Sequence, residues 1–317
     1  MALTSSSDLL LQRGLKLSHL RLLSALAETA QISQAAVQIG ITQPAASRLL
    51  AEIERIVGQP VHHRTGRGMT LTAVGQAFAA RARRIQVELR DAARDMAEAA
   101  SGGAGHVRIG SVTGPAIDRV LPVVRAARLT SPHVTFEVIV APSDILCAHL
   151  LAGRIDFAIG RLPIGPERTF FEMRLIAPEP VALMVRKGHP LAQHPNPGVD
   201  DLLAYDWVMP PADSLLTRTV LDKLRAHGAQ TPPQRLSTSS FLLTFALLQQ
   251  SNAIAPLALA VANSFSLAPN APYTVLAVDL GITVESFGLV TRAGAVLPPT
   301  AAQVAHNIQT LDLPIFD

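Results

Sequence analysis

Five polar or turn-forming residues open a predicted helix between positions 42 and 57. Thr42, Gln43 and Pro44 come first, and Ser47 and Arg48 follow one turn later. Amide, hydroxyl and guanidinium groups can hydrogen-bond to base edges and phosphates, and free N–H groups at a helix start can hold a phosphate. An apolar stripe begins only afterwards, at Leu49, Leu50, Ile53 and Ile56. The pattern predicts a helix whose leading end contacts nucleic acid while its apolar side packs on the protein.

Another short helix is predicted directly upstream. In ISQAAVQIG, Ser33 is the expected cap and Gly40 the expected end, which leaves Gly40 and Ile41 as the whole connection. Two short helices joined so tightly form a helix-turn-helix, whose second helix enters the major groove of DNA. We therefore also expect Ser33 and Gln34 to lie at the DNA. The alternative is a generic helical bundle with ordinary caps.

The segment PVHHRTGRGMTLT favours the DNA-binding interpretation. Two glycines flank Arg67 within a short β-type stretch, as in a wing that reaches the DNA backbone or minor groove. Arg64 and Arg67 are the predicted contacts, and the alternative is that both are solvated surface arginines. Residues 1–100 carry 12 Lys+Arg against 8 Asp+Glu, whereas residues 101–317 carry 15 against 16. A basic N-terminal third suits a nucleic-acid module.

A long helix is predicted to follow this module and to make a dimer. At about 1.5 Å per residue it would reach roughly 40 Å. Small or apolar residues recur along it at alternating steps of four and three, which is the pattern of a two-stranded seam. The seam consists of Leu71, Gly75, Phe78, Ala82, Ile85, Leu89, Ala92, Met96 and Ala99. The alternative is that this stripe packs on the C-terminal part of the same chain.

The glycine-rich stretch SGGAG separates the helical part from an α/β part. Strand-like and helix-like segments then alternate, which predicts an α/β fold with a mostly parallel sheet. We expect a DNA-binding domain over residues 1–71, a linker helix over 72–101 and an effector-binding domain over 102–317. Its first lobe would span about 105–180 and 283–317, and its second lobe about 181–282.

Polar residues at the carboxyl ends of the predicted strands mark a candidate ligand site, because open α/β sheets bind ligands there. The predicted effector contacts are Ser111, Thr113, Ser143 and Arg161 in the first lobe, and Ser214, Thr217, Ser239 and Ser240 in the second. Helix starts with hydroxyl side chains favour a small ligand bearing carboxylate or hydroxyl groups. The hydroxyl side chains have an alternative role as plain helix caps, and Arg161 could instead form a salt bridge to Glu167 or Glu172.

Composition narrows the classes of protein to which this chain can belong. The chain of 317 residues is 49% apolar, with a mean hydropathy of +0.30, yet its apolar runs are all interrupted before about 18 residues. The N-terminus lacks the pattern of a secretory signal, and the single cysteine, Cys147, sits among apolar residues. We therefore expect a cytoplasmic protein without a membrane partner.

Enzymatic chemistry has no support in the sequence. The ten histidines form no metal-type cluster, and neither a nucleophile elbow, a glycine-rich phosphate loop nor a pair of catalytic carboxylates is present. We expect no catalytic residues, no metal and no cofactor. The retained alternative is a cytoplasmic small-molecule-binding protein or an enzyme with a helical appendage.

The stretch from Ala35 to Phe78 resembles the N-terminal domain of the LysR-type transcriptional regulators. That family has paired alanines, a Ser/Thr-Gln-Pro-Ala-x-Ser segment, a Leu-Glu-x-x-Leu-Gly-like helix end, an arginine before a glycine-rich wing, and Leu-Thr-x-x-Gly opening a long helix. In this chain the pattern reads Ala35-Ala36, Thr42 to Ser47, Ile53-Glu54 to Val57-Gly58, Arg64, Gly66-Arg67-Gly68 and Leu71 to Gly75. Chain length and the α/β pattern downstream fit the same family.

The resemblance implies an N-terminal winged helix-turn-helix, a dimerisation helix and a two-lobed effector domain like a periplasmic binding protein. It implies as partners double-stranded promoter DNA, a small-molecule effector, a second copy of the chain in a homodimer or homotetramer, and RNA polymerase. The stretches QISQAA, TQPAASR and LAEIE resemble a branch that regulates sugar uptake and aromatic-acid catabolism, so a sugar or an organic acid is the expected effector.

One position departs from the family pattern. A Leu-Phe pair usually stands before the wing arginine, and here Val61 and His62 occupy those places. A histidine at this packing position either loosens the packing of the wing against the helices or forms a contact with a polar partner.

Overall fold

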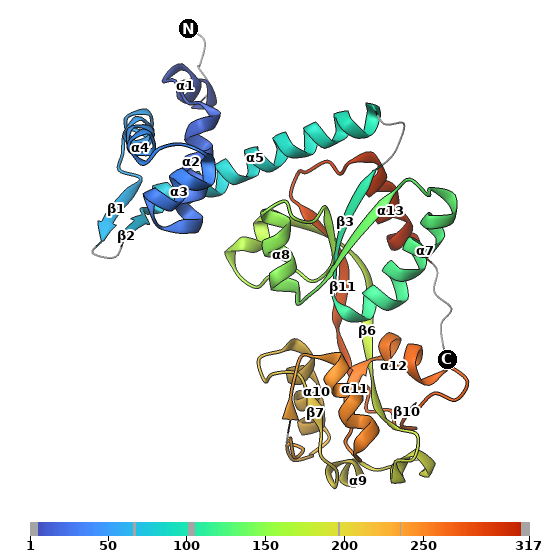
Figure 1. The fold of residues 1–317 in the computed structure, drawn as a ribbon. Coiled ribbons are helices and arrows are strands. Elements are labelled where there is room, and N and C mark those ends of the chain that lie inside the picture. Colours follow the sequence, from blue (N-terminus) through green and yellow to red (C-terminus); the bar gives the residue numbers. More distant parts are fainter. Residues whose placement is uncertain (1–5, 66–67, 101–104, 196, 235, 312–317) are drawn as a thin grey trace. The chain divides into compact units, whose positions relative to one another are not determined.

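The computed structural model describes residues 6–65, 68–100, 105–195, 197–234 and 236–311 of the chain. The chain divides into two compact units, namely residues 1–102 with 151–153, and residues 103–150 with 154–317 (Figure 1). None of the described helices has both the length and the apolar character needed to cross a membrane.

The first unit is helical with one small antiparallel hairpin. Its elements are α1 (Ser6–Gln12), α2 (Leu17–Thr29), α3 (Ile32–Ile39), α4 (Gln43–Val57), β1 (His62–Thr65), β2 (Gly68–Leu71) and α5 (Ala73–Ala100). α3 and α4 form the predicted helix-turn-helix. Gly40 ends α3 with a left-handed φ of 76°, which a glycine adopts without a steric penalty.

The caps of these helices were predicted only in part. Thr42 is the N-cap of α4, as expected, and its hydroxyl accepts a hydrogen bond from the Ala45 N–H at 3.4 Å. The prediction that Ser33 caps α3 was wrong, because the helix begins two residues earlier than expected. Gln31 is the N-cap residue and makes no side-chain cap, so Ser33 lies inside the first turn with its side chain exposed.

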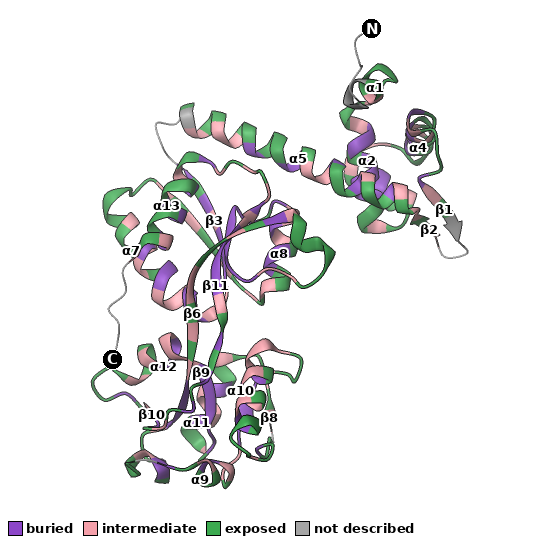
Figure 2. Ribbon diagram, turned by 180° about the vertical axis from the view of Figure 1, so that it is seen from behind, coloured by how far each residue is buried: buried purple, intermediate pink, exposed green. Residues whose placement is uncertain are grey.

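The core of this unit lies where α2, α3, α4 and α5 meet. Its fully buried members include Leu22, Leu23, Ala35, Ala46 and Ile53, with Val61 from the start of the hairpin. Alanines at the helix crossings let the backbones approach closely, and the leucines fill the centre. Figure 2 shows this buried side of α2 in contrast to the exposed outer faces of α4 and α5.

The predicted seam along α5 divides into two halves. Gly75 and Ala82 are buried within the first unit, so the first half of the seam completes the core of its own chain. Ile85, Leu89 and Met96 are 42%, 48% and 68% exposed, so the second half presents apolar side chains to solvent. The intramolecular alternative therefore holds for the first half, although against α2 and not against the C-terminal part of the chain.

The second unit is built on a seven-stranded mixed sheet. Its strands are β3 (His106–Ser111), β4 (Thr135–Val140), β5 (Phe157–Gly160), β6 (Phe171–Arg186), β9 (Ala255–Ala258), β10 (Tyr273–Val275) and β11 (Thr283–Arg292). The hydrogen-bonded order is β10-β6-β11-β5-β3-β4, with β9 on the far half of β6. The prediction of a mostly parallel sheet was wrong, because only β4, β3 and β5 run parallel. β11 is antiparallel to both neighbours, since the chain returns to the first lobe from the second.

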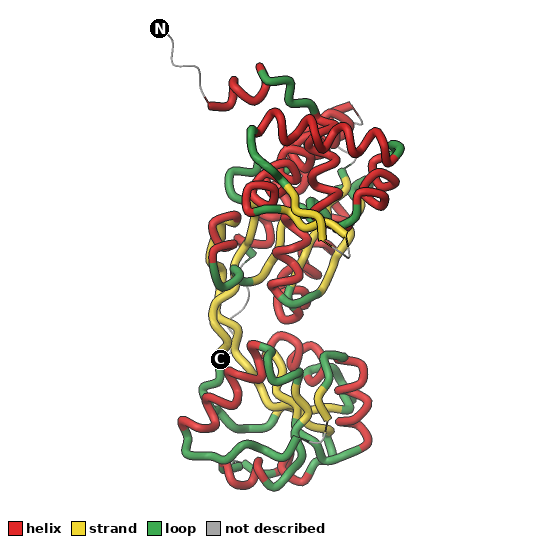
Figure 3. Tube along the Cα trace, turned by 90° about the vertical axis from the view of Figure 1, so that its left-hand side faces the viewer, coloured by secondary structure: helices red, strands yellow, loops and turns green. Residues whose placement is uncertain are grey.

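Two strands connect the two lobes of this unit. β6 pairs with β11 up to Pro180 and then with β9 and β10 from Val181 onward. β11 starts at Thr283, opposite Pro180, and leads the chain back into the first lobe. Figure 3 shows the two strands passing side by side between the lobes.

Helices cover both lobes. The first lobe has α6 (Thr113–Pro115), the π-helical η1 (Ala116–Val120), α7 (Leu121–Thr130), α8 (Ser143–Leu151), the 3₁₀ turn η2 (Pro166–Phe170) and α13 (Pro299–Thr310). The second has η3 (Pro190–Gln193), α9 (Val199–Leu203), α10 (Leu215–Ala226), α11 (Phe241–Gln250) and α12 (Leu259–Ser266), with the short parallel pair β7 (Val208–Met209) and β8 (Leu236–Ser237). Phe157 and Phe287 lie in the core of the first lobe, and Trp207 is fully buried in that of the second.

Candidate functional site

The leading end of α4 presents a row of exposed polar side chains. Thr42, Gln43, Pro44, Ser47 and Arg48 are all exposed, while Ala46, Leu50, Ile53 and Ile56 on the other side of the helix are buried in the core. The two faces follow from the helical period of 3.6 residues. The exposed row can donate and accept hydrogen bonds without any rearrangement of the core.

A groove runs between this helix and the hairpin, with a volume of about 710 Å³. It brings together three of the predicted DNA contacts, namely Ser33 from α3 and Gln43 and Ser47 from α4. The other lining residues are Gln31, Ile32, Leu50, Ala51, Glu54, His62, Gly68 and Met69. The groove is therefore walled by both helices of the helix-turn-helix and by both strands of the hairpin.

The remaining predicted DNA contacts lie around this groove. Gln34 is exposed on α3, and Thr42, Pro44 and Arg48 are exposed at the start of α4. Arg64 belongs to β1, where it pairs with Met69 of β2. Arg67 lies outside the described residues.

The base of the hairpin is fixed by Glu54 of α4. Its carboxylate accepts a hydrogen bond from the Val61 N–H at 3.0 Å and lies 2.9 Å from Nδ1 of His62. The unusual histidine thus meets a polar partner, which was one of the two alternatives for this departure from the family pattern. Val61 itself is fully buried, and its carbonyl accepts from the Thr72 N–H at 3.0 Å.

The other strand of the hairpin is held by the turn between α2 and α3. The Met69 N–H donates to the Ala30 carbonyl at 2.9 Å, and Ala30 has a left-handed φ of 53°. A Cβ on Gly68 would lie 2.8 Å from that same carbonyl oxygen, so the close approach requires glycine. Both strands are therefore anchored to the helix-turn-helix.

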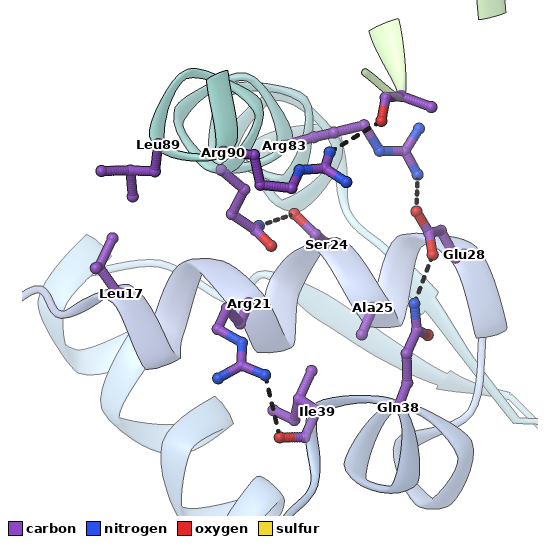
Figure 4. Close-up of a pocket in the computed structure, with 12 residues that line it drawn as sticks. Leu17, Arg21, Ser24, Ala25, Glu28, Gln38, Ile39, Arg83, Leu89 and Arg90 are labelled. Carbon is purple, nitrogen blue, oxygen red and sulfur yellow. Dashed lines mark hydrogen bonds and ion pairs between the residues drawn. The ribbon is translucent and has the colours of Figure 1, made fainter. Parts of the chain in front are cut away.

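Polar contacts also join α2 to α3 and α5 (Figure 4). Glu28 of α2 accepts a hydrogen bond from Gln38 of α3 at 2.8 Å and forms an ion pair with Arg83 of α5. Gln86 of α5 donates to Ser24 of α2 at 2.7 Å, and Arg21 of α2 donates to the Ile39 carbonyl at 3.4 Å. The spacing of apolar residues gave no signal for these contacts, because they join elements that are distant in sequence.

In the second unit, Arg161 occupies the point where the crossing strands leave the first lobe. It follows β5 and is only 8% exposed. Its guanidinium donates to the Glu179 carboxylate at 2.7 Å and, at 2.8 and 2.6 Å, to the Glu285 carbonyl, which lies in an irregularity of β11 between Val284 and Phe287. A structural salt bridge was one of the two alternatives for Arg161, but its partner is Glu179 and not Glu167 or Glu172.

The other predicted contacts of the first lobe surround Arg161. The Ser143 hydroxyl accepts a hydrogen bond from the Arg161 N–H at 3.1 Å. Ser111 is fully buried, and its hydroxyl donates to the Val112 carbonyl at 2.8 Å. Thr113 is half-buried at the start of α6. The ends of β3, β4 and β5 therefore converge as predicted, although Ser111 already has an internal partner.

The predicted contacts of the second lobe follow β7 and β8, which are neighbours. Ser214 caps α10 by accepting from the Thr217 N–H at 3.1 Å, and Thr217 is fully buried and donates to the Pro210 carbonyl at 2.9 Å. Ser240 caps α11 by accepting from the Leu243 N–H at 3.3 Å, and Ser239 beside it is exposed. Ser214 and Ser240 thus take the capping role that was the alternative to ligand binding.

An acidic residue that the sequence did not single out lies beside this junction. Burial raises the pKa of Asp118, in η1, to about 6, and the nearby Glu179 raises it further while Arg119 lowers it. The Asp118 Oδ1 atom is buried and has no hydrogen-bond partner in the described part of the chain. No sequence pattern marks this residue, because its environment depends on β6 crossing behind it.

The described residues contain no group of three or more His, Cys, Asp or Glu side chains that could hold a metal ion. Cys147 is buried, as expected, and burial raises the pKa of its thiol to about 11. Its sulfur lies 3.7 Å from the Arg161 carbonyl oxygen, so this cysteine packs behind the junction and stays protonated at neutral pH.

Two sequence families match this chain. Residues 17–76 match the bacterial regulatory helix-turn-helix proteins of the lysR family, and residues 100–311 match the LysR substrate binding domain. The HTH-type transcriptional regulator GbpR of Rhizobium radiobacter is 44% identical over 76% of this chain and 81% of its own length. A GbpR of Azospirillum brasilense is 32% identical over 92% of this chain and 85% of its own length.

Solved structures share the fold. Full-length CbnR complexed with its target DNA matches with a TM-score of 0.59 at 23% identity, covering 93% of this chain and 99% of the other. A full-length OxyR variant from Pseudomonas aeruginosa matches with a TM-score of 0.62 at 20% identity, covering 95% and 99%. At these identities the similarity is one of fold.

The raised pKa of Asp118 predicts how stability depends on pH. Below the ordinary value of 3.8 the carboxyl is protonated in both states, and as the pH rises through about 6 the folded protein loses the stability that the neutral form provided. Asp118→Asn should therefore raise the free energy of unfolding at pH 7 by on the order of 1 kcal/mol, discounted for partial exposure, and by nothing near pH 4.

Thermal denaturation at the two pH values measures this difference. Asp213→Asn, at an exposed loop position, is the matched control and should change neither value. Equal melting temperatures for wild type and Asp118→Asn at pH 7 would contradict the prediction.

Proposed function

Because the chain belongs to the family of LysR-type transcriptional regulators, we propose that it reads promoter DNA with the leading end of α4 and with the β1–β2 hairpin. The groove that joins Ser33, Gln43 and Ser47 to the hairpin carries this proposal. Gln43, Ser47 and Arg48 face the base edges of the major groove, where amides, hydroxyls and guanidinium groups discriminate bases. Ser33, Gln34, Thr42 and Pro44 lie against the DNA backbone, and Arg64 and Arg67 on the hairpin make phosphate or minor-groove contacts.

The protein acts as a dimer through the second half of α5. Ile85, Leu89 and Met96 offer an exposed apolar stripe on an otherwise polar helix, and a parallel or antiparallel copy would cover it. Two DNA-reading ends on one dimer recognise a roughly palindromic site with half-sites about one helical turn apart, or a multiple of it. Dimers pair into tetramers, and RNA polymerase is contacted at the promoter in the cytoplasm.

The second unit senses a small-molecule effector between its two lobes. The starts of α6 and α8 in the first lobe and of α10 and α11 in the second carry hydroxyl side chains. Ser214 and Ser240 cap α10 and α11, whereas Thr113 and Ser239 lie beside helix starts without being their N-cap residues. The effector is a sugar or an organic acid. Arg161 contributes to its binding indirectly, because it holds β6 and β11 in place beside the effector site. An effector that prefers one arrangement of the lobes shifts the population toward it and alters how the dimer binds or bends DNA.

DNA binding is tested by footprinting the region upstream of the protein's own gene at moderate salt. Arg48→Ala should weaken specific binding by about 1–3 kcal/mol, because it removes a base-edge contact. Arg55→Ala is the matched control, since Arg55 is exposed in the last turn of the same helix. The proposal fails if the wild type leaves no footprint, or if the two variants weaken binding equally.

Dimerisation is tested by sedimentation velocity. Leu89→Glu places a charge in the exposed stripe and should weaken the dimer at least about tenfold, which corresponds to about 1.4 kcal/mol. Ala80→Glu adds the same charge at an exposed position of α5 outside the seam and should leave the dimer intact. A Leu89→Glu protein that remains dimeric at the same concentration would place the dimer contact elsewhere.

Effector binding is tested by a thermal-shift screen over sugars and organic acids. A ligand at one hundred times its Kd adds about 2.7 kcal/mol to the folded state. Thr113→Val should weaken the response about tenfold through one lost hydrogen bond, whereas Thr130→Val, at the exposed end of α7, should not. A ligand that stabilises both variants equally would place its site away from the start of α6.

A further inference from the structure

His62 lies where the recognition helix, the hairpin and the groove meet. It opens β1, pairs across the hairpin with Leu71 and lines the groove together with Ser33, Gln43 and Ser47. Its side chain keeps 16% of its accessible surface, so the ring is mostly packed but not sealed. The family pattern has an apolar phenylalanine here, which packs but has no hydrogen-bonding group.

The two ring nitrogens of His62 have different environments. Nδ1 lies 2.9 Å from the Glu54 carboxylate, which can only accept, so Nδ1 carries the proton in this contact. Nε2 has no hydrogen-bond partner among the described residues and is not among their buried unpaired atoms, so it is open to solvent on the ring that lines the groove. The ring is therefore held at one nitrogen and available at the other.

We propose that His62 is a DNA-backbone contact, in which Nε2–H of the imidazolium donates to a phosphate oxygen while Glu54 orients the ring from behind. This inference rests on the proposed DNA-binding function of the groove. A hydrogen bond between a charged donor and phosphate is stronger than a neutral one and releases a counterion from the DNA. The contact is a binding role that the usual phenylalanine could not perform.

Among the described lining residues of the groove, only His62 can offer a positively charged donor to a phosphate. Glu54 and His62 are its only titratable lining residues in the described part of the chain, and the facing residues of α3 and β2, namely Gln31, Ile32, Ser33, Gly68, Met69 and Leu71, carry no charge. With Nδ1–H donated to the carboxylate, a neutral ring would present a lone pair at Nε2 and repel phosphate oxygens. The contact therefore needs a proton on Nε2 as well as on Nδ1, which only the imidazolium provides.

The salt dependence of DNA binding separates this contact from a packing role. With a duplex covering the region upstream of the protein's own gene, fluorescence anisotropy gives the slope of log affinity against log salt. His62→Phe keeps an aromatic ring of the family type but should lower the slope by about one and weaken binding about three- to tenfold at low salt.

His63→Phe is the matched control. His63 is the next residue on β1, so it points to the opposite face of the strand, and it is exposed. The His63→Phe substitution should leave the slope unchanged. Glu54→Gln keeps an oxygen for the Val61 N–H but removes the ionic partner of the ring, so it should reproduce part of the His62→Phe loss.

Three outcomes decide between the possibilities. A His62→Phe protein with unchanged slope and affinity and an unchanged melting temperature would overturn the proposal, because the histidine would then only fill space. Equal losses in His62→Phe and His63→Phe would overturn it too, as a general effect of hairpin charge. If wild type itself fails to bind the duplex while remaining folded, the proposed function fails, which is a separate result from either of these.

Discussion

One carboxylate determines how the DNA-reading surface is assembled. Glu54 belongs to α4, the second helix of the helix-turn-helix, and it holds the Val61 N–H and the His62 ring at the start of the hairpin. Val61 is fully buried, so an unpaired N–H there would cost about 1–3 kcal/mol. The Val61 carbonyl in turn accepts from Thr72, just before α5. The backbone of Val61 therefore connects α4 on one side and the start of α5 on the other. The hairpin cannot tilt away from α4 without breaking these hydrogen bonds.

Arg161 has an equivalent position in the second unit. It receives its backbone support from Ser143 and Cys147 of α8, and its side chain binds Glu179 of β6 and the carbonyl of Glu285 in β11. Both strands that connect the lobes are thus tied to the first lobe at the point where they leave it. A change in lobe arrangement has to work against this junction, and the Asp118 carboxyl beside it is costly to ionise because burial raises its pKa.

The linker helix combines two tasks along one rigid element. Its first half buries Gly75, Ala79 and Ala82 against the helix-turn-helix, and polar contacts from Arg83 and Gln86 to α2 continue this contact by another turn. Its second half exposes Ile85, Leu89 and Met96. A partner that covers the exposed half would therefore fix the orientation of the DNA-reading surface directly, because no flexible segment separates the two halves of the helix.

Local signals in the sequence located the elements of the first unit and the exposed end of α4. Helical spacing, the Thr42 cap and the Gly40 terminator are short-range signals, so α3, α4, the hairpin and the long helix could be located, and so could the exposed row from Gln43 to Arg48. The start of α3 was predicted two residues too late, at Ser33 instead of Gln31, because a helix without a side-chain cap leaves no sequence signal at its first residue.

The pairing of polar groups with each other became visible only in the folded structure. The Glu54–His62 contact, the Arg161–Glu179 ion pair and the raised pKa of Asp118 all depend on how separate elements pack against each other. The same holds for the antiparallel return of β11, which a strand-helix alternation does not reveal. Periodicity reports which face of an element is apolar, whereas the partner of a charged side chain is set by packing between elements, and that information is not local.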